Sequence, residues 1–142
     1  MSGSDEHKVV PEQRQMRELS VEECLELLTE EGLGRVAFVT DGEPSILPVN
    51  YLLHDGTVMF RTTYGPMLDA IGSGARVAFE VDGFNSSSHA GWSVVLHGKA
   101  EEIWLPDELE DARHLPINPW APGDRNHYVR IFPSAITGRR IV

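Results

Sequence analysis

The first eighteen residues show no regular spacing of apolar and polar positions. Residues 1–18 carry charged side chains, two glutamines and one proline, a composition typical of segments that do not pack. We therefore predict a disordered leader over 1–18 and one folded domain over 19–142. The domain begins with a helix, because Ser20 and Glu23 have the spacing of a capping box, which satisfies free amide donors of the first turn. One apolar stripe follows at helical spacing, formed by Val21, Cys24, Leu25 and Leu28.

From Gly34 onward, short apolar runs alternate with turn residues, which is the pattern of an antiparallel β-sheet. Asp41-Gly42 and Asp55-Gly56 are hairpin signals, because glycine tolerates the positive φ that tight turns demand. The runs expected to form strands are 35–40, 46–53, 57–62, 76–81, 91–104, 127–132 and 136–142. Short helices are expected at 66–71 and 106–113, and loops at 82–90 and 115–126. Gly98 is expected to mark a bend or bulge. The sequence predicts a mainly β protein, a closed or half-closed antiparallel barrel with a few short helices.

The negative net charge of the chain argues against two classes of binding partner, nucleic acids and anionic membranes. The chain has 22 acidic and 12 basic side chains, for a formal charge of −10. Nucleic acids and anionic membranes both attract basic surfaces, so neither is an expected partner. No apolar run approaches the roughly 20 residues that span a bilayer. The single cysteine, Cys24, excludes an intrachain disulfide and fits a reducing cytosol, so a cytoplasmic location is predicted.

The segment with the most suggestive chemistry is Phe60-Arg61-Thr62-Thr63-Tyr64-Gly65. An arginine and two hydroxyls leave a predicted strand just before a predicted helix, and guanidinium, hydroxyl and amide donors together can hold a phosphate. The alternative is that Arg61 faces solvent and the threonines only favour a strand. In Pro48-Val49-Asn50-Tyr51, a proline within a strand belongs at a sheet edge or beside a ligand. Either a flat ring system lies along this edge, or it is an ordinary edge strand.

Other catalytic and metal-binding patterns are missing from the sequence. The six histidines do not have the spacing of a zinc site, and no second cysteine assists them, so no metal site is predicted. A haem held by one histidine stays open. The sequence contains no nucleophile elbow, phosphate-binding loop or dinucleotide fingerprint.

Seven segments carry a resemblance to a known family: 34–37, 48–51, 60–62, 77–82, 91–94, 119–123 and 136–141. In their order and spacing they resemble the FMN-binding split β-barrels of the pyridoxamine 5′-phosphate oxidase-like family. The resemblance is strongest to its small actinobacterial and nitroimidazole-resistance-like branch, and it covers about Leu19 to Val142. It implies a six-stranded antiparallel split β-barrel. It also implies a homodimer with two flavin sites at the interface.

The same resemblance implies roles for two groups of residues. The FMN phosphate would be held at the end of a strand by Arg61, Thr62 and Thr63. The isoalloxazine ring would be contacted by Pro48, Val49, Asn50, Trp92, Ser93 and Trp120. Within this second group Ser93 would supply a polar contact, and Trp120 would come from the same or the partner subunit.

Met67 departs from the family pattern, which commonly has a lysine here as a second phosphate cation. One missing charge-assisted contact, about 1.5–3 kcal/mol, predicts an FMN affinity lower by roughly tenfold or more. In one alternative Arg76 substitutes for the lysine, and in another Met67 faces the core. FMN is the predicted cofactor, and the deazaflavin F420, haem or no cofactor are the alternatives that the superfamily uses.

The predicted function is that of an FMN-dependent oxidoreductase that reduces or oxidises an unknown small molecule. The alternative is a non-catalytic flavin, F420 or haem carrier. Pyridoxamine-phosphate oxidase activity itself is not expected, because the C-terminal region has no clear basic cluster beyond Arg139 and Arg140. No general acid or base is identified, and His127 and Tyr128 are candidates only through their position in the sequence.

Overall fold

The computed structural model describes residues 14–71 and 73–142. The elements in chain order are β1 (Met16–Glu18), α2 (Val21–Glu30), β2 (Leu33–Thr40), β3 (Glu43–His54), β4 (Thr57–Thr62), α3 (Pro66–Ile71), β5 (Ser73–Asn85), β6 (Ala90–Glu102), α4 (Pro106–Arg113) and β7 (His127–Ile141). The described part of the chain is mainly β with three short helices, as the hydrophobic pattern predicts. Within the described residues, no helix is long and apolar enough to cross a membrane.

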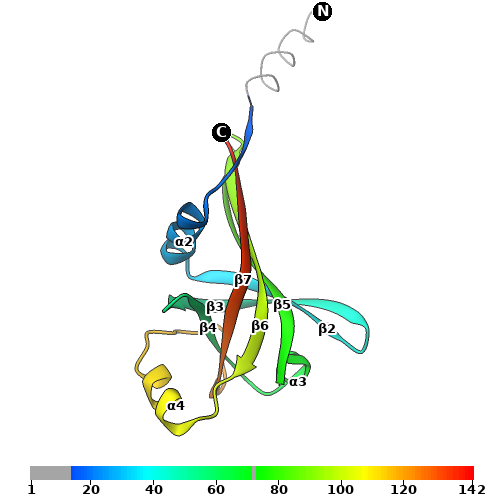
Figure 1. Cartoon of the computed structure of the whole chain (residues 1–142), viewed down its shortest axis with the longest axis vertical. Coiled ribbons are helices and arrows are strands. Elements are labelled where there is room, and N and C mark those ends of the chain that lie inside the picture. Colours follow the sequence, from blue (N-terminus) through cyan, green and yellow to red (C-terminus); the bar gives the residue numbers. More distant parts are fainter. Residues whose placement is uncertain (1–13, 72) are drawn as a thin grey trace, which may run out of the picture.

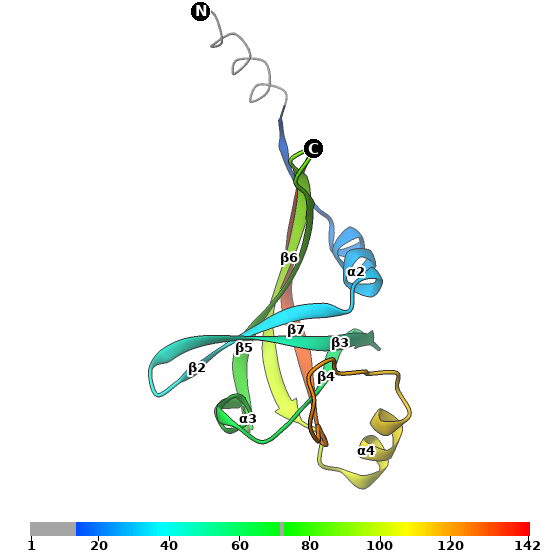
Figure 2. The same cartoon turned by 180° about the vertical axis from the view of Figure 1, so that it is seen from behind.

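All strand pairings are antiparallel, and the strand order is β1-β7-β4-β3-β2-β5-β6. A further pairing of β7 with β6 connects the ends of this order, so six strands form a closed ring and β1 lies outside it. Six is the number that the family resemblance implies, and it is one fewer than the seven runs expected from the hydrophobic pattern. The long strands β5, β6 and β7 extend beyond the ring, toward the chain termini (Figure 1). Figure 2 shows the opposite side, with α3 and α4 at the other end of the molecule. We call the projecting part, residues 82–93 and 138–141, the arm.

The largest differences from the sequence prediction concern three segments. Met16–Glu18 forms β1 on the edge of β7, so the end of the predicted leader is part of the sheet, whereas residues 1–13 lie outside the described part. The predicted loop at 82–90 shortens to a tight turn, because β5 stays paired to β6 as far as Asn85 and Ala90. The two predicted C-terminal strands are one continuous strand, β7. The polar residues of the arm look like a loop in sequence because much of the arm is exposed on both faces.

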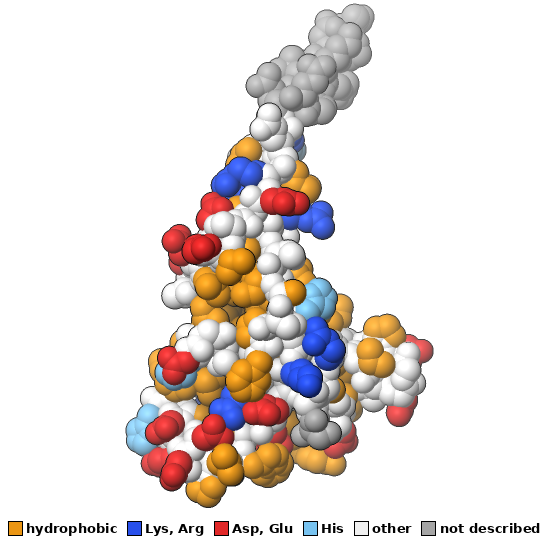
Figure 3. Space-filling view, viewed as in Figure 1, with side chains coloured by type: hydrophobic (Ala, Val, Ile, Leu, Met, Phe, Trp, Pro, Cys, Tyr) orange, Lys and Arg blue, Asp and Glu red, His pale blue; other side chains and the backbone are white. Residues whose placement is uncertain are grey.

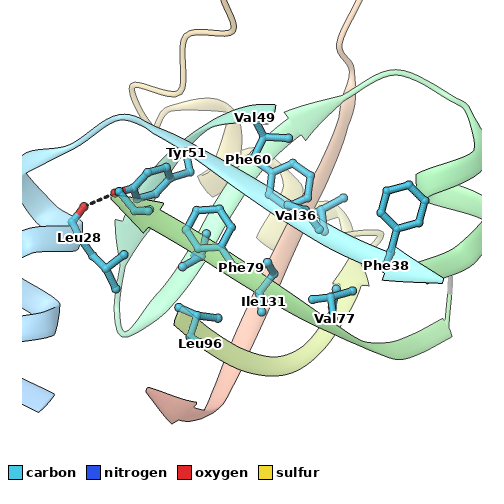
Figure 4. Packing of buried hydrophobic residues seen from close by; sticks show 14 of the residues in the cluster. Leu28, Val36, Phe38, Val49, Tyr51, Phe60, Val77, Phe79, Leu96 and Ile131 are labelled. Atoms are coloured by element: carbon cyan, nitrogen blue, oxygen red, sulfur yellow. Dashed lines mark hydrogen bonds between the residues drawn. The ribbon is translucent and has the colours of Figure 1, made fainter. Parts of the chain in front are cut away.

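The hydrophobic core fills the ring and is covered on one side by α2 (Figure 4). The capping box forms as predicted: the Glu23 amide donates to Ser20 Oγ at 3.2 Å, and the Ser20 amide donates to Glu23 Oε1 at 2.9 Å. Tyr51 crosses from β3 and its hydroxyl donates to the carbonyl of Leu28 at 2.6 Å. Burial raises the pKa of Tyr51, so the phenol stays protonated as a donor. Cys24 is fully buried, as the apolar stripe predicts.

A charged cluster on the outside of β2 and β5 combines two carboxylates with one guanidinium. Arg35 Nη1 lies 3.1 Å from Glu80 Oε1 and 3.6 Å from Asp82 Oδ2. Partial burial, followed by the hydrogen bond and charge of Asp82, outweighs the effect of Arg35 and raises the pKa of Glu80 to about 7. Perturbed carboxylates often mark functional sites. Glu80 itself, however, lines none of the described cavities, whereas Asp82 lines one of about 290 Å³. The Glu80–Arg35 pair is therefore a structural feature of the sheet.

This cluster predicts that stability falls as pH rises from about 4.5 to about 7, because the folded protein retains the Glu80 proton over that range while the unfolded chain loses it. Glu80 is partly exposed, so we expect a loss of only about 1–2 kcal/mol. Glu80→Gln should remove this component and raise stability at pH 8 more than at pH 5. Urea unfolding at both pH values tests this. An equal effect at the two pH values would contradict it.

Candidate functional site

The largest described cavity, of about 390 Å³, lies between the middle of β3, the β4–α3 junction and the loop at 115–126. Its walls are Leu47, Pro48, Val49, Thr62, Thr63, Tyr64, Gly65, Pro66, Met67, Ala121 and Arg125. The volume is within the range of small-molecule sites, about 300–1,000 Å³. We call it the β3–α3 cavity. It brings together five of the ten residues that the sequence singles out: Pro48, Val49, Thr62, Thr63 and Met67.

Backbone geometry explains why these residues meet. Pro48 lies opposite Arg35 in the part of β3 that pairs with β2 alone, because the pairing with β4 begins only at Tyr51, so the missing N–H of proline is tolerated there. The next residue, Val49, is buried in the core. Thr62 is the last residue of β4 and is buried, and its hydroxyl donates to the carbonyl of Thr63 at 3.3 Å. Thr63 is exposed at the cavity wall. The cavity thus combines apolar residues of β3 with two threonines at and just after the end of β4.

Arg61 lies outside the β3–α3 cavity, unlike its neighbour Thr62. Successive strand residues point to opposite faces, and Arg61 stacks over the ring of Tyr128, with its Cζ atom 5.3 Å from the ring centroid. Its Nε donates to the carbonyl of Arg125 at 2.9 Å and its Nη1 to the carbonyl of Ile117 at 3.2 Å. The alternative considered from the sequence, that Arg61 faces solvent, does not fit either, because its side chain is hydrogen-bonded to the loop at 115–126.

Asn50 also holds this loop. Its Oδ1 accepts from the Trp120 amide at 2.7 Å, and its Nδ2 donates to the Gly32 carbonyl at 3.4 Å. The loop is therefore joined to β3 by Asn50 and to β4 by Arg61, across sequence separations of 70 and 64 residues. The Trp120 side chain is 75% exposed, so its indole makes little contact within this chain.

Arg125 is the cation of the β3–α3 cavity, and the sequence does not single it out. It is half-buried at the wall, where its Nε lies 3.4 Å from the Ala121 carbonyl and its Nη2 lies 3.5 Å from the Pro122 carbonyl. The residue lies in a proline-rich loop with no periodic pattern, so only the folded structure brings it to the same cavity as Thr62 and Thr63.

Met67 lies at the base of the β3–α3 cavity with only 3% of its surface exposed, and it packs with the core cluster. This is the core-facing alternative that the sequence left open. Arg76, the other candidate for the missing cation, is exposed elsewhere and donates to Ser134 Oγ at 3.1 Å. Neither side chain supplies a second positive charge at the cavity.

Trp92 and Ser93 lie on the arm, where they line a different cavity of about 290 Å³. Trp92 packs flat over Gly83, where an added Cβ would meet the indole at 3.1–3.2 Å. No residue lines both this arm cavity and the β3–α3 cavity. Within one chain, the structure therefore separates the predicted site residues into two groups.

His127 is paired with a buried carboxylate at the end of the ring. Its Nδ1 lies 2.6 Å from Glu102 Oε2, and the Glu102 side chain is only 6% exposed. The pair joins β6 to β7 next to Thr62, which is opposite His127 in the β4–β7 ladder. No described cavity is lined by His127, so its contacts assign it a structural role between strands.

The protein is acidic overall, so an arginine at the wall of the β3–α3 cavity is unusual. The space-filling view shows acidic side chains gathered over α4 and beside α2 (Figure 3). At the β3–α3 cavity itself, Tyr64 is 70% exposed, and its pKa is raised by a hydrogen bond to Asp69 and by that residue's charge. None of the ion pairs among the described residues involves Arg61 or Arg125. The hydrogen-bond acceptors of both guanidinium groups are therefore backbone carbonyl oxygens.

Comparison with known proteins identifies the family of the chain. Residues 20–140 match the family model described as pyridoxamine 5′-phosphate oxidase. The uncharacterized protein Rv0080 of Mycobacterium tuberculosis is 34% identical over 134 residues, which cover 91% of this chain and 88% of that protein.

Two solved structures are similar over most of the chain. The FAD binding protein from Mycobacterium smegmatis is 33% identical, with a TM-score of 0.72, over 87% of this chain and 98% of that one. A FAD-binding protein from Mesorhizobium loti is 27% identical, with a TM-score of 0.76, over 88% of this chain and 97% of that one. The family model spans nearly the whole described sheet and its covering helices. The chain is a member of the pyridoxamine 5′-phosphate oxidase-like family of split-barrel proteins.

Proposed function

We propose that this protein binds a flavin in the β3–α3 cavity and works as a flavin-dependent oxidoreductase on a small molecule. The observation that carries the proposal is the composition of the cavity wall. Apolar residues in the middle of β3, Pro48 and Val49, line the same cavity as two threonines, Thr62 and Thr63, and one arginine, Arg125, in a chain of formal charge −10. Apolar surface suits a flat ring, and hydroxyl and guanidinium donors suit a phosphate.

The proposed contacts divide the cavity into two parts. Pro48 and Val49 would lie against the isoalloxazine ring, with Asn50 fixing the adjacent loop. Thr62 and Thr63 would donate to the phosphate. The flavin supplies the redox chemistry when bound, and the protein supplies binding and orientation. FMN and FAD share the riboflavin 5′-phosphate group that this arrangement fits, and the FAD-binding relatives favour testing both.

We further propose that two copies of the chain complete the site. The arm carries Trp92 and Ser93 away from the cavity, and Phe84 at the tip of the arm and Trp120 at the cavity loop are 79% and 75% exposed. A second chain would cover these apolar side chains and bring a ring-contacting residue to the cavity. Light scattering should therefore give the mass of a dimer. A stable monomer at micromolar concentration would contradict a shared site.

The test of flavin binding is titration of purified protein with FMN and with FAD, followed by quenching of flavin fluorescence. Thr63→Trp should block binding, because it fills the cavity from an exposed wall position. Thr29→Trp, at an exposed position of α2, is the matched control and should bind as the wild type does. Equal binding by both variants would contradict the placement in this cavity.

The alternative function is a carrier of flavin, F420 or haem without turnover. A carrier would bind its group in the same cavity as the proposed oxidoreductase. The two functions therefore differ in whether the bound group exchanges electrons, and binding alone does not distinguish them. We expect bound flavin to be reduced by a nicotinamide donor and reoxidised by a small organic acceptor, followed by absorbance. A bound flavin that exchanges no electrons with any donor or acceptor would favour the carrier. A haem or F420 spectrum in the purified protein would overturn the flavin proposal.

A further inference from the structure

The structure gives the two arginines near the β3–α3 cavity different positions. Arg61 donates from Nε and Nη1 to two carbonyls of one loop, those of Arg125 and Ile117. Its guanidinium also stacks on Tyr128, on the face of β4 opposite to Thr62. To reach a phosphate beside Thr62, Arg61 would have to give up both hydrogen bonds and the stacking. Its contacts are those of a residue that fixes the loop.

Arg125 has the opposite set of features. Its side chain lines the cavity that contains Thr62 and Thr63, and its two hydrogen bonds to loop carbonyls are long, at 3.4 and 3.5 Å. Long bonds to neutral acceptors are weak, so they compete little with an anion. A guanidinium forms two parallel hydrogen bonds to a phosphate, and these are stronger than bonds to a carbonyl. Among the described residues that line the β3–α3 cavity, Arg125 is the only lysine or arginine.

The contact that joins the two arginines is direct. The backbone carbonyl of Arg125 accepts the 2.9 Å hydrogen bond from Arg61 Nε. Removing Arg61 therefore frees the backbone of the residue that carries the charge at the cavity. Asn50 holds the same loop five residues earlier, at Trp120, so the segment 120–125 is held near both of its ends.

We propose that Arg125 is the residue that binds the flavin phosphate, and that Arg61 is a positioning residue that holds Arg125 at the cavity. This assignment rests on the proposed function. It replaces the expectation, carried over from the family resemblance, that Arg61 itself contacts the phosphate. It also identifies a phosphate cation in a chain whose position 67 is a buried methionine.

The first test compares FMN with riboflavin, which lacks the phosphate. Arg125→Gln should weaken FMN binding about 10- to 100-fold, the effect of one lost charge-assisted contact, and leave riboflavin binding unchanged. The FMN affinity of the variant should also depend less on salt. Arg76→Gln removes the same charge from an exposed arginine and is the matched control, with FMN affinity equal to that of the wild type. An equal loss for FMN and riboflavin, or no loss for either, would overturn the assignment.

The second test separates positioning from contact. Arg61→Lys keeps the positive charge but cannot donate to both carbonyls from one planar group. It should weaken FMN binding several-fold, and the double variant Arg61→Lys/Arg125→Gln should bind FMN no more weakly than Arg125→Gln alone. Independent, multiplicative losses would mean that Arg61 contacts the phosphate itself. If Arg61→Lys does not fold, Arg125→Lys serves instead, with a loss of FMN affinity smaller than that of Arg125→Gln.

The two proposals fail in different ways. A wild-type protein that binds none of FMN, FAD and riboflavin would overturn both the proposed function and the role of Arg125. A wild-type protein that binds FMN and riboflavin with equal affinity would leave the flavin site standing and overturn the phosphate contact. Binding of FMN that is tighter than that of riboflavin, and lost selectively in Arg125→Gln, supports both.

Discussion

Gly98→Ala should destabilise the fold by about 3 kcal/mol or more, one of the two largest effects expected of a single substitution in this chain. A Cβ at position 98 would lie 2.0 Å from the carbonyl oxygen of Phe132 and 2.8 Å from its carbonyl carbon. Both atoms are backbone, so no side-chain rotation relieves the clash. The clash falls at the point where the pairing of β6 with β7 shifts register, between His97 and Gly98. Separation of β6 from β7 there would open the ring.

Thermal and urea unfolding of Gly98→Ala measure this effect. Gly32→Ala is the matched control, because a Cβ at position 32 meets no atom within 4 Å and its backbone is not in the left-handed region. We expect the control to differ little from the wild type. If the two variants unfold at the same urea concentration, the close approach of β6 and β7 at Gly98 is not present in solution.

Gly98 also shows what sequence can predict about this fold. A glycine inside a strand too long to be straight predicts a bulge, and the register shift confirms it. The hairpin turns are equally local: Asp41 and Gly42 have φ values of 51° and 77°, the positive pair that the Asp-Gly signal predicts. By contrast, the arm was missed, because its strands are stabilised by pairing to each other and to β7 rather than by an apolar pattern of their own.

The sequence predicts only those residues of the candidate site that belong to short continuous motifs. The threonines at the end of β4 and the proline of β3 stand out in sequence, and both line the β3–α3 cavity. The direction of Arg61 was not predictable, because it depends on which face of β4 meets the loop that follows α4. Arg125 was not predictable for the same reason, since the contact with Arg61 that places it spans 64 residues. Long-range hydrogen bonds to carbonyls have no sequence signature.

Met67→Lys is the substitution that best separates the sequence-based hypothesis from the folded structure. From the family resemblance alone, a lysine at this position should restore a phosphate cation and tighten FMN binding. In the structure, Met67 is 3% exposed and packs within the core cluster beside Leu68 and Ile71. Burying an ammonium group among apolar side chains without a partner is costly, because the charge loses its hydration. We therefore expect destabilisation of about 3–5 kcal/mol and no gain in FMN affinity.

Met67→Leu is the control for the volume of the side chain. This change conserves apolar character and nearly conserves size, so it should cost less than about 1.5 kcal/mol and leave FMN binding unchanged. Urea unfolding of both variants, with FMN titration of whichever remains folded, decides between the two hypotheses. If Met67→Lys unfolds like the wild type and binds FMN more tightly, then the ammonium group reaches the β3–α3 cavity past Pro66 and Thr63. In that case the lysine extends into the cavity that Met67 already lines, and the cavity has room for a second cation beside Arg125.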